Sequence, residues 1–293
     1  MLRHWSGLAQ SVGLWRNGGE HSSIRLGEPD TLTAGSAICR DRSWESWGRQ
    51  DPYYGVLTDD RYRRENLDDR RKLEFMETGR LHIGRVLGLV EQRFGAMSST
   101  GSALDFGCGG GRVLVSLSGV FRRVIGVDVS EAMLKVAGEN CAERGIQNVE
   151  LCPSDDDLSQ VEGSFDFIHS YLVFQHIPVR RAERILGRLV DRLNDGGILA
   201  VQLPFLIKAS KLRRAIHVLR RNFLPFSHLV NIAAGRRWSE PFMQMNTYDM
   251  NRVLSILSEQ GARDMFVHVF EEGRFVSAFV VARKAVHPEV RRG

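Results

Sequence analysis

A glycine-rich loop is the segment of this sequence best suited to bind a small ligand. The run Gly107-Cys108-Gly109-Gly110-Gly111 follows a short apolar stretch, residues 103–106, and precedes a helical pattern that begins at Arg112. Glycines let a backbone pass close to a ligand, and the first amides of a helix point toward it. Asp105 stands before the loop at D-x-G-x-G-x-G spacing. A carboxylate there suits a ligand that carries an amine better than it suits a pyrophosphate.

Other nucleotide-binding loops fit this segment less well. A dinucleotide fingerprint, G-x-G-x-x-G/A, would need a small residue where Arg112 stands. A phosphate-binding loop would need Gly-Lys-Ser/Thr, which the segment lacks. The loop therefore predicts a ligand other than a dinucleotide or a nucleoside triphosphate.

Further acids follow the next two predicted strands. Asp128 ends the second strand, 23 residues after Asp105, where a carboxylate accepts hydrogen bonds from both hydroxyls of a ribose. The triplet Asp155-Asp156-Asp157 follows the third strand, where one acid could reach an adenine amino group. A solvated turn explains Asp157 equally well.

Strands and helices must alternate to position these residues. The apolar patterns predict strands at 103–106, 124–129, 149–152, 165–171 and 198–203, and helices at 112–118, 131–144 and 178–194. This order predicts an α/β fold with a parallel sheet covered on both faces. A helix at 248–260 and strands at 264–270 and 274–282 follow. The last two strands are joined by so short a turn that they must be antiparallel.

Four parts can be distinguished within one predicted domain, residues 41–293. Residues 1–40 lack a steady period and are expected to be a disordered tail. The parts of the domain are a helical extension (41–101), a ligand-binding core (102–203), a basic helical insert or lid (204–246) and a C-terminal helix with a strand pair (247–283).

These motifs resemble those of the class I S-adenosylmethionine-dependent methyltransferases. The matching segments are LDFGCGGGR, VIGVDVSEAMLKVA, and VELCPSDDDL followed by GSFDFIHSYLVFQHIP. The resemblance covers residues 70–203 and, in outline, 248–282. It implies a Rossmann-like, doubly wound sheet of seven strands, mostly parallel with an antiparallel C-terminal strand, and S-adenosylmethionine as cofactor.

The resemblance also implies roles for particular residues. Asp128 would hold the ribose, Met133 would lie near the adenine, and Asp155 would approach the adenine amine. The full cofactor set implied is Asp105, Phe106, Gly107, Cys108, Gly109, Gly111, Asp128, Val129, Met133, Asp155, Asp156 and Ser170. Two features depart from the family's usual pattern. Three glycines follow one another at 109–111. The tripeptide Ser154-Asp155-Asp156 lacks the Gly-Asp that is usual at that point, so the acid that meets the adenine could shift by one position.

Few residues outside the cofactor motifs are candidates for binding the methyl acceptor. His176 follows the fourth strand and is a candidate general base, or it simply caps the next helix. Tyr171 and Gln175 are candidate substrate contacts. Tyr54, with its neighbour Tyr53, would close over the methionine end of the cofactor or pack on the sheet. Arg80 would pair with the cofactor carboxylate or lie exposed on its helix.

The basic character of the chain is concentrated in the insert. The whole chain has 40 basic and 35 acidic residues, for a net charge of +5. Residues 204–246 hold a single acid, Glu240, and eight of the bases: Lys208, Lys211, Arg213, Arg214, Arg220, Arg221, Arg236 and Arg237. Apolar residues in 212–223 recur at helical spacing, which predicts a basic amphipathic helix. Such a helix would be a lid, a peripheral membrane contact through 208–232, or a dimer contact.

The sequence thus predicts methyl transfer to an oxygen or nitrogen of a small-molecule, sugar or lipid-linked acceptor, one with negative charge. An RNA methyltransferase is one alternative, although residues 170–173 lack the Asn/Asp-Pro-Pro-Tyr/Phe motif of base methylation, and no nucleic acid is expected. A non-catalytic cofactor-binding protein is the other. The four cysteines lack CxxC spacing, the histidines lack HExxH spacing, and no apolar run approaches the ~20 residues of a membrane span. These patterns predict a cytoplasmic protein without a metal.

Overall fold

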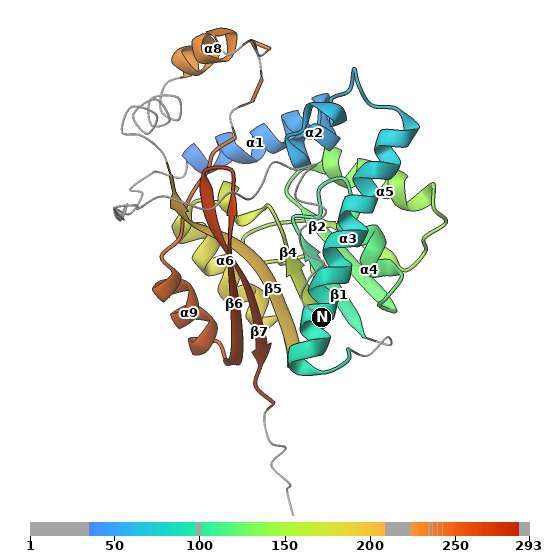
Figure 1. Ribbon diagram of the computed structural model, residues 1–293, viewed down its shortest axis with the longest axis vertical. Coiled ribbons are helices and arrows are strands. Elements are labelled where there is room, and N and C mark those ends of the chain that lie inside the picture. The colour runs from blue at the N-terminus through green and yellow to red at the C-terminus, as the bar shows by residue number, and fades with distance from the viewer. Residues whose placement is uncertain are drawn as a thin grey trace, which may run out of the picture.

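The computed structural model describes residues 35–97, 101–208, 224–233, 235, 237, 238, 240, 241 and 243–286. Most of the predicted tail and the predicted amphipathic helix at 212–223 lie outside these residues. The described residues form one seven-stranded sheet with helices on both faces (Figure 1).

The sheet has the order β3-β2-β1-β4-β5-β7-β6. Its strands are β1 (Ser102–Phe106), β2 (Arg123–Asp128), β3 (Val149–Pro153), β4 (Phe165–Ser170), β5 (Leu193–Ile207), β6 (Ala262–Glu272) and β7 (Phe275–Lys284). The first five strands are mutually parallel, while β7 runs antiparallel to both β5 and β6. The predicted Rossmann-like fold and the antiparallel C-terminal strand are confirmed.

Ten helical segments of the described residues surround the sheet. They are α1 (Gly35–Gln50), α2 (Pro52–Leu57), η1 (Asp60–Tyr62), α3 (Asp69–Phe94), α4 (Arg112–Ser118), α5 (Glu131–Ala142), η2 (Phe174–His176), α6 (Val179–Asp191), α8 (Leu224–Ala233) and α9 (Met250–Glu259). Side chains of α3, α4 and α5 form one buried core with one face of the sheet. Those of α6 and α9 form the core on the other face.

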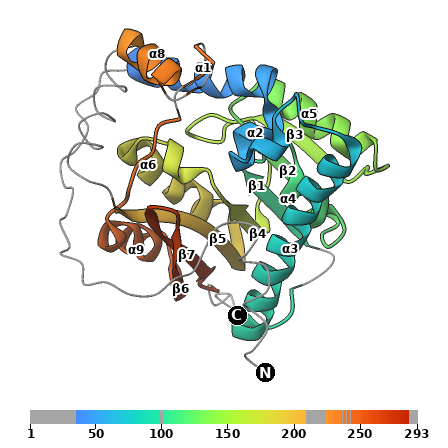
Figure 2. The ribbon, with the colours of Figure 1, turned by 45° about the horizontal axis from the view of Figure 1, so that its top comes forward.

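The N-terminal helices cross the end of the sheet at which the parallel strands finish. Figures 1 and 2 show α1 and α2 above this edge. Glu45 of α1 accepts hydrogen bonds from the Ser130 hydroxyl (2.9 Å) and the Ala132 amide (3.1 Å) at the start of α5. A Cβ added to Gly48 would lie 2.8 Å from Ser130 Oγ, so α1 packs closely on that helix start. The chain before the sheet therefore closes over the ends of the strands.

Several boundaries differ from the sequence-based expectation. Helix α1 begins at Gly35, inside the segment expected to be a tail. Strand β5 begins at Leu193 and ends at Ile207, beyond both ends of the predicted strand at 198–203. It starts early through a pair between Leu193 and Phe165, and it continues because β7 pairs with it as far as Ile207. Such pairing partners are distant in sequence, so local periodicity could not show them.

No helix of the described residues is long and apolar enough to span a bilayer.

Candidate active site

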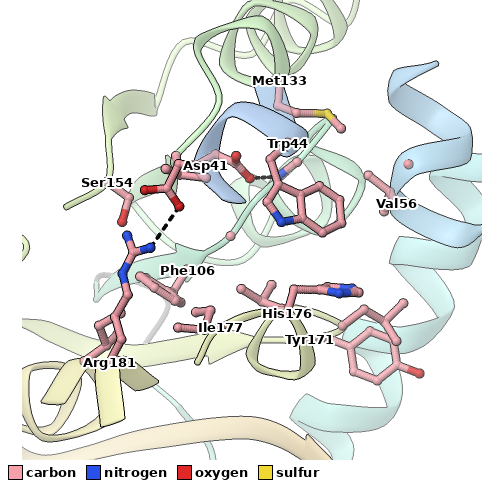
Figure 3. A pocket seen from close by; sticks show the side chains of 18 of the residues that line it. Asp41, Trp44, Val56, Phe106, Met133, Ser154, Tyr171, His176, Ile177 and Arg181 are labelled. Atoms are coloured by element: carbon pink, nitrogen blue, oxygen red, sulfur yellow. Dashed lines mark hydrogen bonds and ion pairs between the residues drawn. The ribbon is translucent and has the colours of Figure 1, made fainter. Parts of the chain in front are cut away.

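A cavity of about 870 Å³ opens where β1, β2 and β4 end. The connection after β1 leads to β2 on one side, and the connection after β4 leads to β5 on the other, so the strand order reverses between β1 and β4. Open α/β sheets bind ligands at such a switch point. The cavity wall includes Gly107 and Gly109 of the glycine loop, Asp128 at the end of β2, and Trp44 of α1 (Figure 3).

The glycine loop has a backbone shape that other residues rarely adopt. Gly107, Gly109 and Gly111 have φ angles of 75°, 51° and 83°. A Cβ at Gly107 would lie 2.3 Å from a methyl group of Val173, so a side chain there would collide with the cavity wall. The amides of Gly107 and Cys108 both donate to the Val127 carbonyl, at 2.8 and 2.9 Å, which fixes the loop against β2.

Asp128 is held by two backbone amides. Its Oδ2 accepts from Gly109 N and its Oδ1 from Ser130 N, each at 2.9 Å. Burial raises the pKa of Asp128 to about 6, and the backbone hydrogen bonds oppose that rise. A carboxylate oxygen has two lone pairs, so each oxygen keeps one for a ligand in the cavity. The arrangement fits a ligand with two neighbouring hydroxyls.

The three acids of the triplet 155–157 make different contacts. Asp155 lines the cavity, and its Oδ1 accepts from the amides of Asp157 (3.1 Å) and Ser159 (2.9 Å). Hydrogen bonds from Ser159 lower the pKa of Asp155 and keep it ionised. Asp156 turns away and pairs with Arg181 and Arg184. Asp157 is 3.3 Å from Arg188 at the surface.

Asp105 lies beneath the loop in a buried polar chain. Its Oδ1 is 2.9 Å from His169 Nδ1, and His169 Nε2 is 2.9 Å from His82 Nε2 on α3. Burial, followed by the charge of His169, holds the pKa of His82 well below its usual range. The three side chains thus form one hydrogen-bonded chain from α3 through β4 to β1. Asp105 is therefore held by His169, the residue directly opposite it where β1 and β4 pair.

His176 stands at the junction of this cavity with a second one. The second cavity, about 630 Å³, lies toward β5, β6 and β7. His176 lines both cavities, together with Val56 and Leu172. Its Nδ1 is 2.7 Å from the Gln244 carbonyl, which can only accept, so Nδ1 carries the proton and Nε2 keeps a lone pair. Burial lowers the pKa of His176 to about 4, so the ring is neutral at pH 7.

The residues expected to form the site fall into two groups. One group lines a cavity: Phe106, Gly107, Gly109, Asp128, Val129, Met133, Asp155, Tyr171 and His176 line the first, and Gln175 and His176 the second. The other group supports the walls from behind: Asp105, Cys108, Gly111, Asp156, Ser170 and Tyr54.

The supporting residues act through packing and hydrogen bonds. The Ser170 hydroxyl donates to the Phe106 carbonyl at 2.9 Å, which joins the ends of β1 and β4. Burial raises the pKa of Cys108, which keeps it a thiol. Tyr54 packs on Trp47, with the Arg63 guanidinium 3.6 Å from its ring centre. Tyr54 therefore lies outside both cavities.

Two further predicted contacts lie elsewhere. Arg80 is exposed and pairs with Glu77. Tyr53 donates to Asn140 Oδ1 at 3.1 Å. Arg80 thus takes the alternative that had been left open for it, exposure on its helix. Tyr53 is packed, but on α3 and α5 and not on the sheet.

The sequence reasoning missed the residues that close the cavity from above. Asp41 and Trp44 reach it from α1, and Arg181 from α6. Arg181 joins the two sides because it pairs with Asp41 (2.8 Å) and with Asp156. Trp44 lies over His176, with ring centres 4.7 Å apart (Figure 3). Trp44 opened an aromatic run in the sequence, but only the position of α1 reveals its place in the wall.

Comparisons with known proteins agree with this architecture. Residues 103–197 match the model of a methyltransferase domain family. The trans-aconitate 2-methyltransferase of Deinococcus radiodurans is 37% identical over 103 residues, 34% of this chain and 37% of the relative. A ubiquinone biosynthesis O-methyltransferase of Thiobacillus denitrificans is 37% identical over 76 residues, 26% of this chain and 33% of the relative. The chain thus spans about a third of the length of these curated relatives.

A solved structure extends the likeness in fold beyond these segments. The magnesium protoporphyrin IX methyltransferase of Synechocystis PCC 6803, crystallised with SAH (S-adenosylhomocysteine), superposes with a TM-score of 0.56. It shares 18% identity and covers 85% of this chain and 99% of its own. Residues 103–197 are a class I S-adenosylmethionine-dependent methyltransferase domain, as the motifs indicated. The cofactor of this family is S-adenosylmethionine.

Proposed function

We propose that this protein transfers a methyl group from S-adenosylmethionine to an oxygen or nitrogen of a small molecule. The first cavity would hold the cofactor and the second the acceptor. The observation that carries the proposal is the position of His176, which lines both cavities and whose Nε2 keeps a lone pair because Nδ1 donates to the Gln244 carbonyl.

The first cavity fits the proposed cofactor in its donor set. Asp128 would accept both ribose hydroxyls, and Met133 and Val129 would contact the adenine. Asp155 would meet the adenine amine through Oδ2, which accepts from the Ser159 hydroxyl among the described residues. The cofactor, when bound, supplies an electrophilic sulfonium methyl group.

His176 would remove a proton from the acceptor. The Gln244 carbonyl holds the imidazole in the tautomer whose Nε2 is unprotonated. The low pKa of His176, about 4, keeps that nitrogen available through the whole physiological range. A general base contributes about 10²–10⁴-fold to such a transfer, and most when its pKa lies near the working pH, so the low pKa of His176 puts its expected contribution at about 10²-fold.

The N-terminal helices would exclude water from the reaction. Trp44 covers the imidazole of His176, and Gly55 and Val56 of α2 lie against both cavities. The pair between Arg181 and Asp41 fastens α1 to α6 above the first cavity. Electrostatic interactions in a site closed to water are stronger than in an open one.

The insert is proposed to fasten the N-terminal segment that covers the cavities and to offer a surface for docking. Arg237 pairs with Glu65 at 2.8 Å and with Asp51 at 3.4 Å, and Lys208 pairs with Glu271. These two cations thus support the fold. Three apolar side chains on and after α8 expose more than half of their area: Leu229 (59%), Ile232 (55%) and Trp238 (55%). Leu229 and Ile232 favour one of the three roles left open for the insert, a peripheral contact through 208–232 with an anionic membrane surface or a lipid-linked acceptor.

The test is methyl transfer from labelled S-adenosylmethionine into a metabolite extract. A labelled product that appears with the wild-type protein and is lost with His176→Gln supports the proposal. Binding of S-adenosylhomocysteine without any labelled product would favour the non-catalytic alternative. A label that enters RNA, with steeply salt-dependent binding, would favour the RNA alternative.

A further inference from the structure

The wall of the second cavity carries a carboxyl group that the cofactor motifs do not explain. Glu272 ends β6 and lies at the hairpin that leads into β7. Among the described residues that line this cavity, Glu272 and His176 are the titratable ones. His176 is neutral at pH 7, so Glu272 determines the charge of the cavity.

Glu272 is held in place by a side chain of β5, the strand that lies on the other side of β7 in the sheet. Gln202 of β5 is 1% exposed, and its Nε2 donates to Glu272 Oε2 at 3.2 Å and to Ser277 Oγ at 3.4 Å. The Oε1 of the same amide accepts from the Leu172 amide at 3.0 Å. This last bond fixes which way the Gln202 amide faces. Glu272 is therefore an oriented acceptor, with Oε1 left for a ligand.

The rest of this cavity is mainly apolar. Leu57, Pro204, Met243, Met245 and Phe275 line it. Burial raises the pKa of Glu272, and the hydrogen bond from Gln202, followed by the charge of Arg112, opposes that rise. A half-buried carboxyl group in such surroundings repels an anion when it is ionised, and it gains most from a ligand that donates a hydrogen bond or carries positive charge.

We infer that Glu272 selects the acceptor, binding an amine or hydroxyl of a molecule with an apolar body and disfavouring a carboxylate. The inference rests on the proposed function, because it takes the second cavity as the acceptor site. It also separates the acceptor from the positive charge of the insert: the described bases Lys208 and Arg237 pair with acids, whereas the titratable side chains that line the cavity are one acid, Glu272, and the neutral His176. A cavity with an acid in its wall would therefore bind a polycarboxylate poorly.

The experiment measures binding of three six-carbon probes to the protein saturated with S-adenosylhomocysteine. The probes are hexylamine, hexan-1-ol and hexanoate, which share an apolar chain and differ in charge. Calorimetry on the wild type is expected to give the tightest binding for hexylamine and the weakest for hexanoate. In Glu272→Gln the affinity for hexylamine should fall by about tenfold or more, because a charge-assisted hydrogen bond is lost. The preference for hexylamine over hexanoate should then disappear.

Glu271→Gln is the matched control. Glu271 is adjacent in sequence and carries the same charge, but it is exposed and pairs with Lys208 outside the cavity. This variant should keep the order of the three probes. The inference is overturned if hexanoate binds best, if both variants change the order equally, or if none of the probes binds the loaded protein. Failure of S-adenosylhomocysteine itself to bind would instead refute the proposed function.

Discussion

The role proposed for Asp128 predicts that cofactor binding is sensitive to acid, and the size of the effect follows from the surroundings of this side chain. Burial raises the pKa of this carboxyl to about 6 in the free protein. Hydroxyl groups of a ribose donate hydrogen bonds, so they favour the ionised form. At pH 7 about nine in ten Asp128 side chains are ionised, and at pH 5 about one in ten. The dissociation constant for S-adenosylhomocysteine should therefore rise about tenfold between pH 7 and pH 5.

Calorimetry with S-adenosylhomocysteine at pH 5, 6 and 7 measures this effect without knowledge of the acceptor. The pKa of His176 is about 4, so this ring is mostly neutral throughout the range and contributes little. Asp128→Asn is the control, because it removes the titrating group and keeps the shape of the side chain. Its amide also replaces one acceptor oxygen by a donor that faces a backbone N–H. The variant should bind about 10–150-fold more weakly at pH 7, the cost of one lost hydrogen bond to a charged group.

The wild type and Asp128→Asn should also differ in how their affinity for S-adenosylhomocysteine depends on pH. Binding to Asp128→Asn should be nearly constant from pH 5 to pH 7. The reasoning is refuted if the wild-type affinity does not change with pH, if the variant binds as tightly as the wild type, or if the variant keeps the tenfold change.

Three further perturbations test the packing and the chemistry. Gly79→Ala should destabilise the protein by about 1–3 kcal/mol, because the added Cβ would lie 2.2 Å from the Arg112 carbonyl oxygen. Gly84→Ala on the same helix is the control, because its Cβ meets nothing within 4 Å and should not destabilise the protein. Equal melting temperatures of the two variants would contradict this. His176→Gln should lower methyl transfer about 10²-fold or more with S-adenosylhomocysteine affinity within about threefold of wild type, and unchanged turnover would remove it as the base. His82 has a lowered pKa, so the unfolded chain takes up its proton first as the pH falls below about 6.5 and stability is lost. The fall in melting temperature from pH 7 to pH 5 should be smaller in His82→Gln, and an equal fall would contradict the argument.

The cofactor half of the site could be predicted because its residues follow directly from strand ends. A glycine loop between β1 and α4 has a fixed place in an α/β sheet, and Asp128 ends the neighbouring strand, so both had to meet at one edge. The Asp105–His169 contact escaped prediction although the two residues face each other in the sheet. Their contact depends on the register between β1 and β4, which local periodicity does not specify.

The acceptor half depends on contacts between distant segments. Glu272 could be predicted only as a turn residue, because its role requires β7 to pair with β5 and so bring Gln202 beside it. Trp44 lies in a helix whose own pattern does not say which part of the sheet it covers. Its position follows from Glu45, which binds the start of α5. These contacts join segments 70 and 85 residues apart.

A crystal structure with bound S-adenosylhomocysteine tests the central claim most directly. The account predicts adenosine in the first cavity, both ribose hydroxyls on Asp128, and the sulfur facing the second cavity beside His176. A ligand that occupies the second cavity, or a ribose without contact to Asp128, would contradict the account.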